Sequence, residues 1–288
     1  MPNFVVLLPP STQKQPGGNP FAPDMFDYRT SNTFNYFSDL NPQRRHLIDT
    51  LQEAIAEAED PGVLFSELES DFERNEAVRV NEEIYDAPLM SALDRYSPGA
   101  LYSATDFADL PTGAQRRMLE NGVIFSGLFG LLRPDDLVPN YHLEMTAELP
   151  EVGEIGEYWR PDLSDQLNDT LDGRFVWDFL PEELRAVWNN EHSYDERVQV
   201  RFIEEDESGE RTEPEGEDLL QVQGQFVNHI VRETLEDLED TEEWSLIAGF
   251  KLDEEASSYD EDTQTHTLQM VSAPGMEEEA AAAEADEE

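Results

Sequence analysis

The sequence predicts an α+β fold, with a single mixed α/β domain over residues 1–272 and a disordered acidic tail over residues 273–288. Three observations support this. Strand-like apolar segments and amphipathic helices occur together without regular alternation or internal repeats. The 288 residues are enough to bury a sizeable core. The tail consists almost entirely of Ala, Glu and Asp, a composition that cannot bury apolar surface.

The N-terminal half begins with an apolar run at residues 3–8, which predicts a buried strand. Residues 9–32 are rich in Pro, Gly and polar side chains and predict a long loop. A helix should begin at Asn41, because Pro42 suits the first turn and apolar residues then recur at helical spacing. Shorter helices are predicted at 63–71, 73–83, 88–95 and 112–120, and further strands at 121–127 and 142–146.

The C-terminal half shows the same two kinds of pattern. Residues 204–218 contain nine acids and no apolar residue, so we expect a solvated hairpin loop or a disordered insertion there. Helices are predicted at 155–171, 181–188 and 224–240. Strands are predicted at 174–180, 197–203, 219–223, 244–252 and 266–271.

The charge balance is the strongest compositional signal. The chain carries 66 acidic and 18 basic residues, a formal net charge of −48, and its two lysines are Lys14 and Lys251. At molar salt the Debye length is about 3 Å, so dense surface carboxylates barely repel one another. Because the acidity is spread over nearly the whole chain, it predicts a halophilic, cytoplasmic protein. Binding to basic partners is the alternative.

Composition also excludes several functions. The chain has no cysteine, which rules out thiol peroxidase chemistry and thiolate metal sites. No haem motif or zinc-ligand spacing is visible, so we predict no metal site and leave the cofactor unidentified. Pairs such as His142 with Glu144 could join an iron site, but they arise by chance among 66 carboxylates. No apolar run approaches the roughly 18 residues that span a bilayer, so no membrane partner is expected.

Four segments together resemble the YaaA family of peroxide-stress proteins. They are LLPPSTQK at 7–14, APLMSALDRYSPGALY at 87–102, IFSGLFGLLRPDDLVPNYHLEM at 124–145 and EYWRPDLSDQLN at 157–168. The resemblance covers about residues 3–188, and more loosely extends to 271. It implies a cytosolic protein with one mixed α/β fold that limits oxidative damage, linked to lower free iron. It also implies binding to double-stranded DNA, and it supplies no settled enzymatic reaction.

Lys14 is the sharpest single candidate. Nearly all lysines are missing from this chain, so a lysine in the loop after the first strand is expected to do something arginine cannot. It could hold a phosphate or carboxylate, or act as a base. Chance survival is the alternative. Ser11 belongs to the same loop segment of the resemblance.

The segment at 126–133 offers a second anion-binding element. Ser126, Gly127 and Gly130 could bring backbone N–H groups close to an anion, and Arg133 could bind it bidentately. The alternative is a tight turn in which Arg133 pairs with a neighbouring carboxylate. Aromatic and arginine side chains of the matching segments suit a cleft or simple packing; these are Arg95, Tyr96, Tyr102, Tyr141 and Arg160.

Two function classes remain open. The first is a peroxide-stress protein that limits iron-driven damage and has an anion-binding cleft in which Lys14, Arg95, Ser126 and Arg133 converge. The second is a protein that binds double-stranded DNA during peroxide stress. Clustering of the four side chains would favour a small anionic ligand, whereas a continuous arginine face free of carboxylates would favour DNA.

Overall fold

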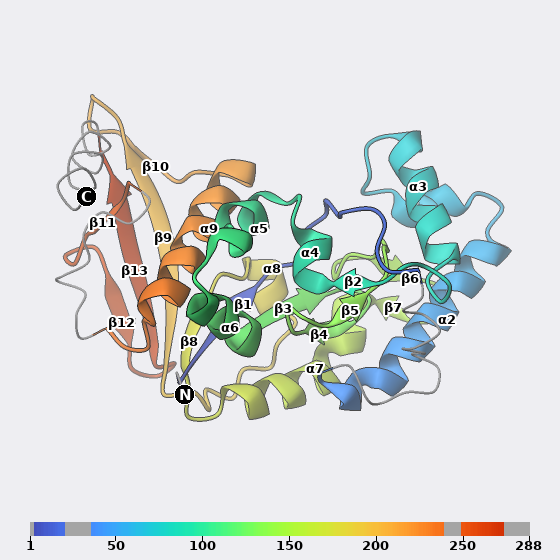
Figure 1. Ribbon diagram of the computed structural model, residues 1–288, viewed down its shortest axis with the longest axis horizontal. Coiled ribbons are helices and arrows are strands. Elements are labelled where there is room, and N and C mark those ends of the chain that lie inside the picture. The colour runs from blue at the N-terminus through green and yellow to red at the C-terminus, as the bar shows by residue number, and fades with distance from the viewer. Residues whose placement is uncertain (1–2, 21–35, 239–248, 274–288) are drawn as a thin grey trace.

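The structure is a computed structural model that describes residues 3–20, 36–238 and 249–273 (Figure 1). Within these residues, eight α-helices and a mixed sheet of nine strands form an α/β fold. The predicted combination of helices and strands is therefore confirmed. The predicted tail lies outside the described residues from position 274 onward.

Five parallel strands form the centre of the sheet. In spatial order they are β13 (Thr265–Ser272), β9 (Glu196–Glu205), β8 (Phe175–Asp178), β1 (Phe4–Leu8) and β3 (Gly122–Ser126). Antiparallel strands flank them: β4 (Gly130–Leu132), β10 (Arg211–Thr212), β11 (Lys251–Leu252) and β12 (Ser258–Asp260). Because β1, β3 and β8 run in the same direction, the loops that follow them leave from one edge of the sheet.

Strand β1 is the buried centre of the fold. All five of its residues are apolar and inaccessible to solvent, as a parallel strand covered on both faces requires. The helices around the sheet are α2 (Asn41–Glu57), α3 (Asp71–Glu82), α4 (Ala92–Tyr96), α5 (Ala100–Thr105), α6 (Thr112–Asn121), α7 (Ile155–Leu171), α8 (Glu182–Arg185) and α9 (Gly216–Glu233). Helix α9 packs beside α5 and α6, while α2 and α3 lie at the end of the molecule opposite β11 and β13 (Figure 1).

Short elements complete the described chain. Two small antiparallel sheets pair β2 (Met90–Ser91) with β5 (Leu137–Val138), and β6 (Glu148–Leu149) with β7 (Gly153–Glu154). Turns of 3₁₀-helix occupy Ser38–Leu40, Pro61–Phe65 and Phe107–Asp109. None of the helices in the described ranges has the length and apolar content needed to cross a bilayer.

Most long elements lie where the sequence predicts them, but two predicted strands are wrong. Residues 219–223 belong to α9, because Leu219, Leu220 and Val222 extend its apolar face, and β10 pairs with β9 instead. Residues 142–146 form no strand. The side chain of Asn81 accepts a hydrogen bond from His142 N (3.0 Å) and donates one to His142 O (2.6 Å), replacing a strand partner at this point.

Other differences concern boundaries. The helix predicted at 63–71 is the 3₁₀ turn at Pro61–Phe65, and the one predicted at 88–95 is the shorter α4. Of the strand predicted at 244–252, only Lys251–Leu252 is a strand, and residues 244–248 lie outside the described chain.

Candidate functional site

A small pocket lies at the edge of the sheet where the parallel strands end. It encloses about 170 Å³. One wall is the loop after β1, another is the segment after β8, and a third is the extended chain at 141–146. The side chains and backbone that line it come from Pro9, Pro10, Ser11, Thr12, Lys14, Tyr141, His142, Leu143, Glu144, Met145, Thr146, Pro181, Glu183 and Leu184.

Lys14 is the cation of this pocket. Its ammonium donates one hydrogen bond, to the backbone oxygen of Ser11 at 3.1 Å, and lies over the ring of Tyr141 with its nitrogen 4.8 Å from the ring centre. In the described chain it forms no ion pair with a carboxylate. Desolvation by burial lowers the pKa of Lys14 to about 8, although Glu144 favours its charged form. The ammonium therefore has donors to spare for a ligand.

A chain of hydroxyls lies behind the lysine. The Tyr141 hydroxyl is 2.7 Å from the Ser126 hydroxyl and also hydrogen-bonds the hydroxyl of Tyr96. Ser126 in turn accepts a bond from Phe129 N at 3.0 Å. The ring of Tyr102 packs against that of Tyr96. The Tyr102 hydroxyl donates to the backbone oxygen of Pro9, a residue that lines the pocket, at 2.6 Å. Burial raises the pKa of each tyrosine, so all three act as neutral donors.

Acidic groups also lie near Lys14. A neighbouring hollow of about 520 Å³ shares Lys14, Tyr141, His142 and Glu144 with the pocket and continues to Glu67. His142 Nε2 lies 3.0 Å from a Glu67 carboxylate oxygen, while desolvation and the charge of Lys14 lower the pKa of His142. Desolvation and the charge of Glu67 raise the pKa of Glu144, so its carboxyl group takes up a proton more readily than usual.

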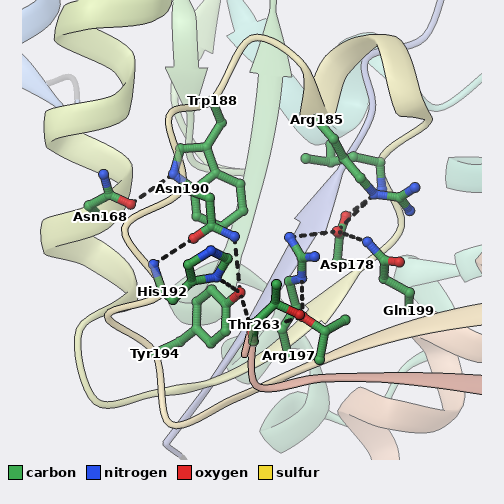
Figure 2. Close-up of polar contacts among 12 residues, drawn as sticks. Asn168, Asp178, Arg185, Trp188, Asn190, His192, Tyr194, Arg197, Gln199 and Thr263 are labelled. Atoms are coloured by element: carbon green, nitrogen blue, oxygen red, sulfur yellow. Dashed lines mark hydrogen bonds and ion pairs between the residues drawn. The ribbon is translucent and has the colours of Figure 1, made fainter. Parts of the chain in front are cut away.

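A buried ionic network holds the wall that follows β8. Figure 2 shows Asp178, the last residue of β8, between Arg185 and Gln199. The Asp178 carboxylate accepts bonds from Leu180 N (2.9 Å), Arg185 Nε (2.9 Å) and Gln199 Nε2 (3.2 Å). These bonds fix the segment that carries Pro181, Glu183 and Leu184, which line the pocket. Removing one partner of a buried ion pair leaves the other charge uncompensated and destabilises the fold.

Arg95 lies next to the pocket loop, but its guanidinium does not face the pocket. It is fully buried and donates to the backbone oxygens of Gln15, Gly17 (3.0 Å), Pro88 (3.1 Å) and Val138 (3.3 Å). Arg95 therefore fastens the loop that carries Lys14 to α4 and β5. Its predicted convergence with Lys14 on a ligand is corrected to this positioning contact, because both Nη atoms of the guanidinium already donate to backbone oxygens.

The remaining predicted arginines lie elsewhere. The guanidinium of Arg133 lies over the ring of Tyr36 and donates to the backbone oxygen of Gly122. The backbone N–H of Arg133 donates to the Asp136 carboxylate at 2.7 Å. Arg160 pairs with Glu157 at 2.7 Å on the surface of α7. Neither side chain lines the pocket of Lys14. The predicted convergence of four donors is therefore replaced by one cation backed by hydroxyl groups.

The two glycines after β3 serve packing. A Cβ at Gly127 would lie 2.6 Å from the carbonyl carbon of Glu144, so only glycine lets this turn approach the pocket wall. Gly130 has a φ of +71° and lies against the ring of Trp159, which is fully buried. Their backbone N–H groups do not line the pocket. The predicted N–H cradle is therefore absent at this pocket among the described residues.

Sequence reasoning missed the contributions of Glu144, Glu183 and Met145 to the pocket. The available signal was position, because residues 141–145 end the longest segment of the resemblance and follow a strand edge. In the described part of the chain, no group of three or more His, Asp or Glu side chains is placed to hold a metal ion.

The fold and the pocket define an α/β protein with a desolvated lysine at the carboxyl edge of a parallel sheet. A sequence model described as peroxide stress protein YaaA matches residues 4–256, nearly the whole chain. The chain therefore belongs to the YaaA family of peroxide-stress proteins.

Individual relatives are similar to parts of the chain. A UPF0246 protein of Streptomyces coelicolor is 33% identical over 111 residues, which are 38% of this chain and 42% of the relative. A UPF0246 protein of Corynebacterium glutamicum is 31% identical over 171 residues, covering 58% of this chain and 62% of the relative. An uncharacterized protein of Campylobacter jejuni is 28% identical over 142 residues, with coverages of 49% and 56%. The chain thus spans about half the length of the curated relatives it matches.

Proposed function

We propose that this protein acts in the response to peroxide stress, limits iron-driven damage, and does so through a small anionic ligand bound at Lys14. Membership of the peroxide-stress family supports the general role. One observation carries the ligand pocket: in a chain with 66 acidic residues, the ammonium of Lys14 has a single hydrogen bond and no carboxylate partner in the described residues. A desolvated cation with spare donors stabilises an incoming anion.

The surroundings of Lys14 favour an anion with one negative charge. Glu144 and Glu183 also line the pocket and would repel a second or third charge on the ligand. A phosphate needs more positive charge than one lysine supplies beside two carboxylates. The apolar lining from Pro10, Leu143 and Leu184 suits a short carbon skeleton. A small monocarboxylate fits these requirements.

The arrangement of arginines gives the DNA alternative little support. In the described chain, many arginines form ion pairs with carboxylates; these are Arg74, Arg79, Arg116, Arg160, Arg185, Arg201 and Arg211. The sequence has two Arg-Arg pairs, at 44–45 and 116–117. Arg44 is buried and donates to the backbone oxygens of Phe129 and Leu131. A duplex would have to displace these partners before its phosphates could bind.

The test uses the full chain in molar KCl with lactate as the probe anion. Lactate should raise the melting temperature of the wild type, because a ligand that binds only the folded state stabilises it. Lys14→Met should abolish the shift, and the matched variant Lys251→Met should retain it. In the native host, Lys14→Met should also lose protection against peroxide.

Two outcomes would count against this proposal. Equal lactate shifts for wild type and Lys14→Met would place the binding elsewhere. Binding of a DNA duplex without any response to monocarboxylates would favour the DNA alternative.

A further inference from the structure

The environment of Lys14 fits a chemical role beyond holding an anion. The pocket and the neighbouring hollow meet at Lys14, so a ligand in either hollow lies beside its side chain. No carboxylate is paired with the amine in the described chain, and the one fixed acceptor is a neutral carbonyl. An amine held in this way is one deprotonation away from being a nucleophile.

We propose that Lys14 condenses with the carbonyl group of a small 2-oxo acid to form an imine in this pocket. The inference rests on the proposed function, since it uses the same pocket and the same monocarboxylate class. Two things are new: the ligand carries a carbonyl group next to its carboxylate, and Lys14 forms a covalent bond with it.

The step balances without an oxidant or reductant. The neutral amine nitrogen of Lys14 attacks the carbonyl carbon, and a C–N bond forms as the carbonyl π bond breaks. The nitrogen gives up one of its protons, and the carbonyl oxygen takes one up, which yields a neutral carbinolamine. The carbinolamine hydroxyl then receives a second proton, from a carboxylic acid, and its C–O bond breaks so that water leaves. The nitrogen lone pair forms the C=N bond. The protonated imine restores the positive charge beside the ligand carboxylate.

Glu144 and Lys14 itself have the protonation properties that this step needs. Glu144 lines the same pocket, and desolvation raises the pKa of its carboxyl group, which allows it to donate the proton that leaves with water. With a pKa of about 8, Lys14 is neutral in about one-tenth of molecules at pH 7, far more than a solvated lysine. The uncharged ring of Tyr141 lies next to the amine, with its centre 4.8 Å from the Lys14 nitrogen.

The near absence of lysine makes the test unusually clean. Full-length protein in molar KCl is incubated with pyruvate and sodium cyanoborohydride, which reduces an imine to a stable secondary amine. Peptide mass spectrometry then locates the adduct. We expect at least tenfold more adduct on Lys14 than on exposed Lys251, no adduct at position 14 in Lys14→Arg, and unchanged labelling of Lys14 in Lys251→Arg.

Lactate provides the matched control ligand, because it has the same carboxylate but no carbonyl. An excess of lactate should suppress labelling of Lys14 in the wild type. This control does not depend on the folding of any variant. If lactate raises the melting temperature but pyruvate gives no Lys14 adduct, the imine inference is wrong and the anion pocket stands. If neither compound interacts with the protein, both proposals are overturned. Equal labelling of Lys14 and Lys251 also overturns the inference.

Discussion

The ammonium of Lys14 lies over the face of the Tyr141 ring, with its nitrogen 4.8 Å from the ring centre. The hydroxyl of the same tyrosine faces a different partner, the Ser126 hydroxyl at the end of β3. Tyr141 therefore connects the two loops that follow β1 and β3, one through its ring and the other through its oxygen. These two contacts can be separated by mutation.

Tyr141→Phe keeps the ring and removes the oxygen. The buried Ser126 and Tyr96 hydroxyls then lose a partner, so the free energy of unfolding should fall by about 1–3 kcal/mol. Lactate affinity should change by less than about threefold, because the contact with Lys14 remains. Urea unfolding and calorimetric titration measure the two quantities. Lost binding with unchanged stability would instead make the hydroxyl a ligand contact.

Gly127→Ala should disturb the pocket from behind. The added Cβ would lie 2.6 Å from the carbonyl carbon of Glu144 and even closer to Leu143 O, so the wall at 143–144 must move. We expect a loss of about 1–3 kcal/mol in stability and weaker lactate binding. Gly113→Ala in α6 is the control, since its nearest neighbour is a side-chain nitrogen at 3.5 Å. Equal behaviour of the two variants would contradict this assignment.

The predictable part of this fold is the part that burial dictates. The apolar runs at β1 and β3 predict buried strands, and the parallel pairing of these strands brings Lys14 and Ser126 to one edge of the sheet. The loop after the first strand could therefore be chosen as a site from sequence. The position of the pocket wall at 141–146 could not be predicted. It depends on hydrogen bonds between the Asn81 side chain and the backbone of His142, two residues that are 61 positions apart in the chain.

Arginine roles were beyond sequence reasoning for a simple physical reason. A guanidinium donates equally well to a ligand anion and to backbone oxygens, and the sequence around Arg95 does not distinguish them. The structure shows four backbone oxygens around Arg95, and Tyr36 and Gly122 beside Arg133. Lysine gave the clearer signal because so few lysines remain in the chain.

Salt should stabilise the protein strongly. The net charge of −48 produces self-repulsion that counter-ions reduce, since the Debye length falls from about 10 Å at 0.1 M salt to about 3 Å at 1 M. The melting temperature is therefore expected to rise steadily from dilute buffer to molar KCl. Matched sucrose solutions control for general exclusion effects. A melting temperature independent of KCl would rule out halophilic adaptation.

Asp136 should make the free energy of unfolding depend on pH between about 4 and 7. Burial raises its pKa from 3.8 to about 6, and its carboxylate accepts bonds from the backbone N–H groups of Tyr36 and Arg133. Between these two values the folded state binds more protons than the unfolded state, so this group favours folding less as the pH rises. From pH 4 to 7 the loss is up to about 3 kcal/mol.

Asp136→Asn should remove that loss. Comparing the two proteins at each pH cancels the general effect of titrating the other carboxylates. The difference in unfolding free energy, wild type minus variant, should therefore fall between about pH 4 and 6. A difference that stays flat across this range would show that the Asp136 carboxyl group is not destabilised by burial.

Lys14→Met separates a functional lysine from a structural one. Below about pH 8 the Lys14 ammonium is charged in both folded and unfolded chains, and burial makes the folded state less favourable. Between about 8 and 10.5 the unfolded chain binds more protons, so the contribution of Lys14 to stability rises with pH. Methionine has no charge to desolvate and keeps a flexible side chain. The variant should therefore unfold at the same or a higher temperature at pH 7, and its stability should lack the rise above pH 8. It should neither bind lactate nor react with pyruvate. A markedly lower melting temperature would mean that Lys14 holds the loop in place, and loss of binding would then follow from loss of structure.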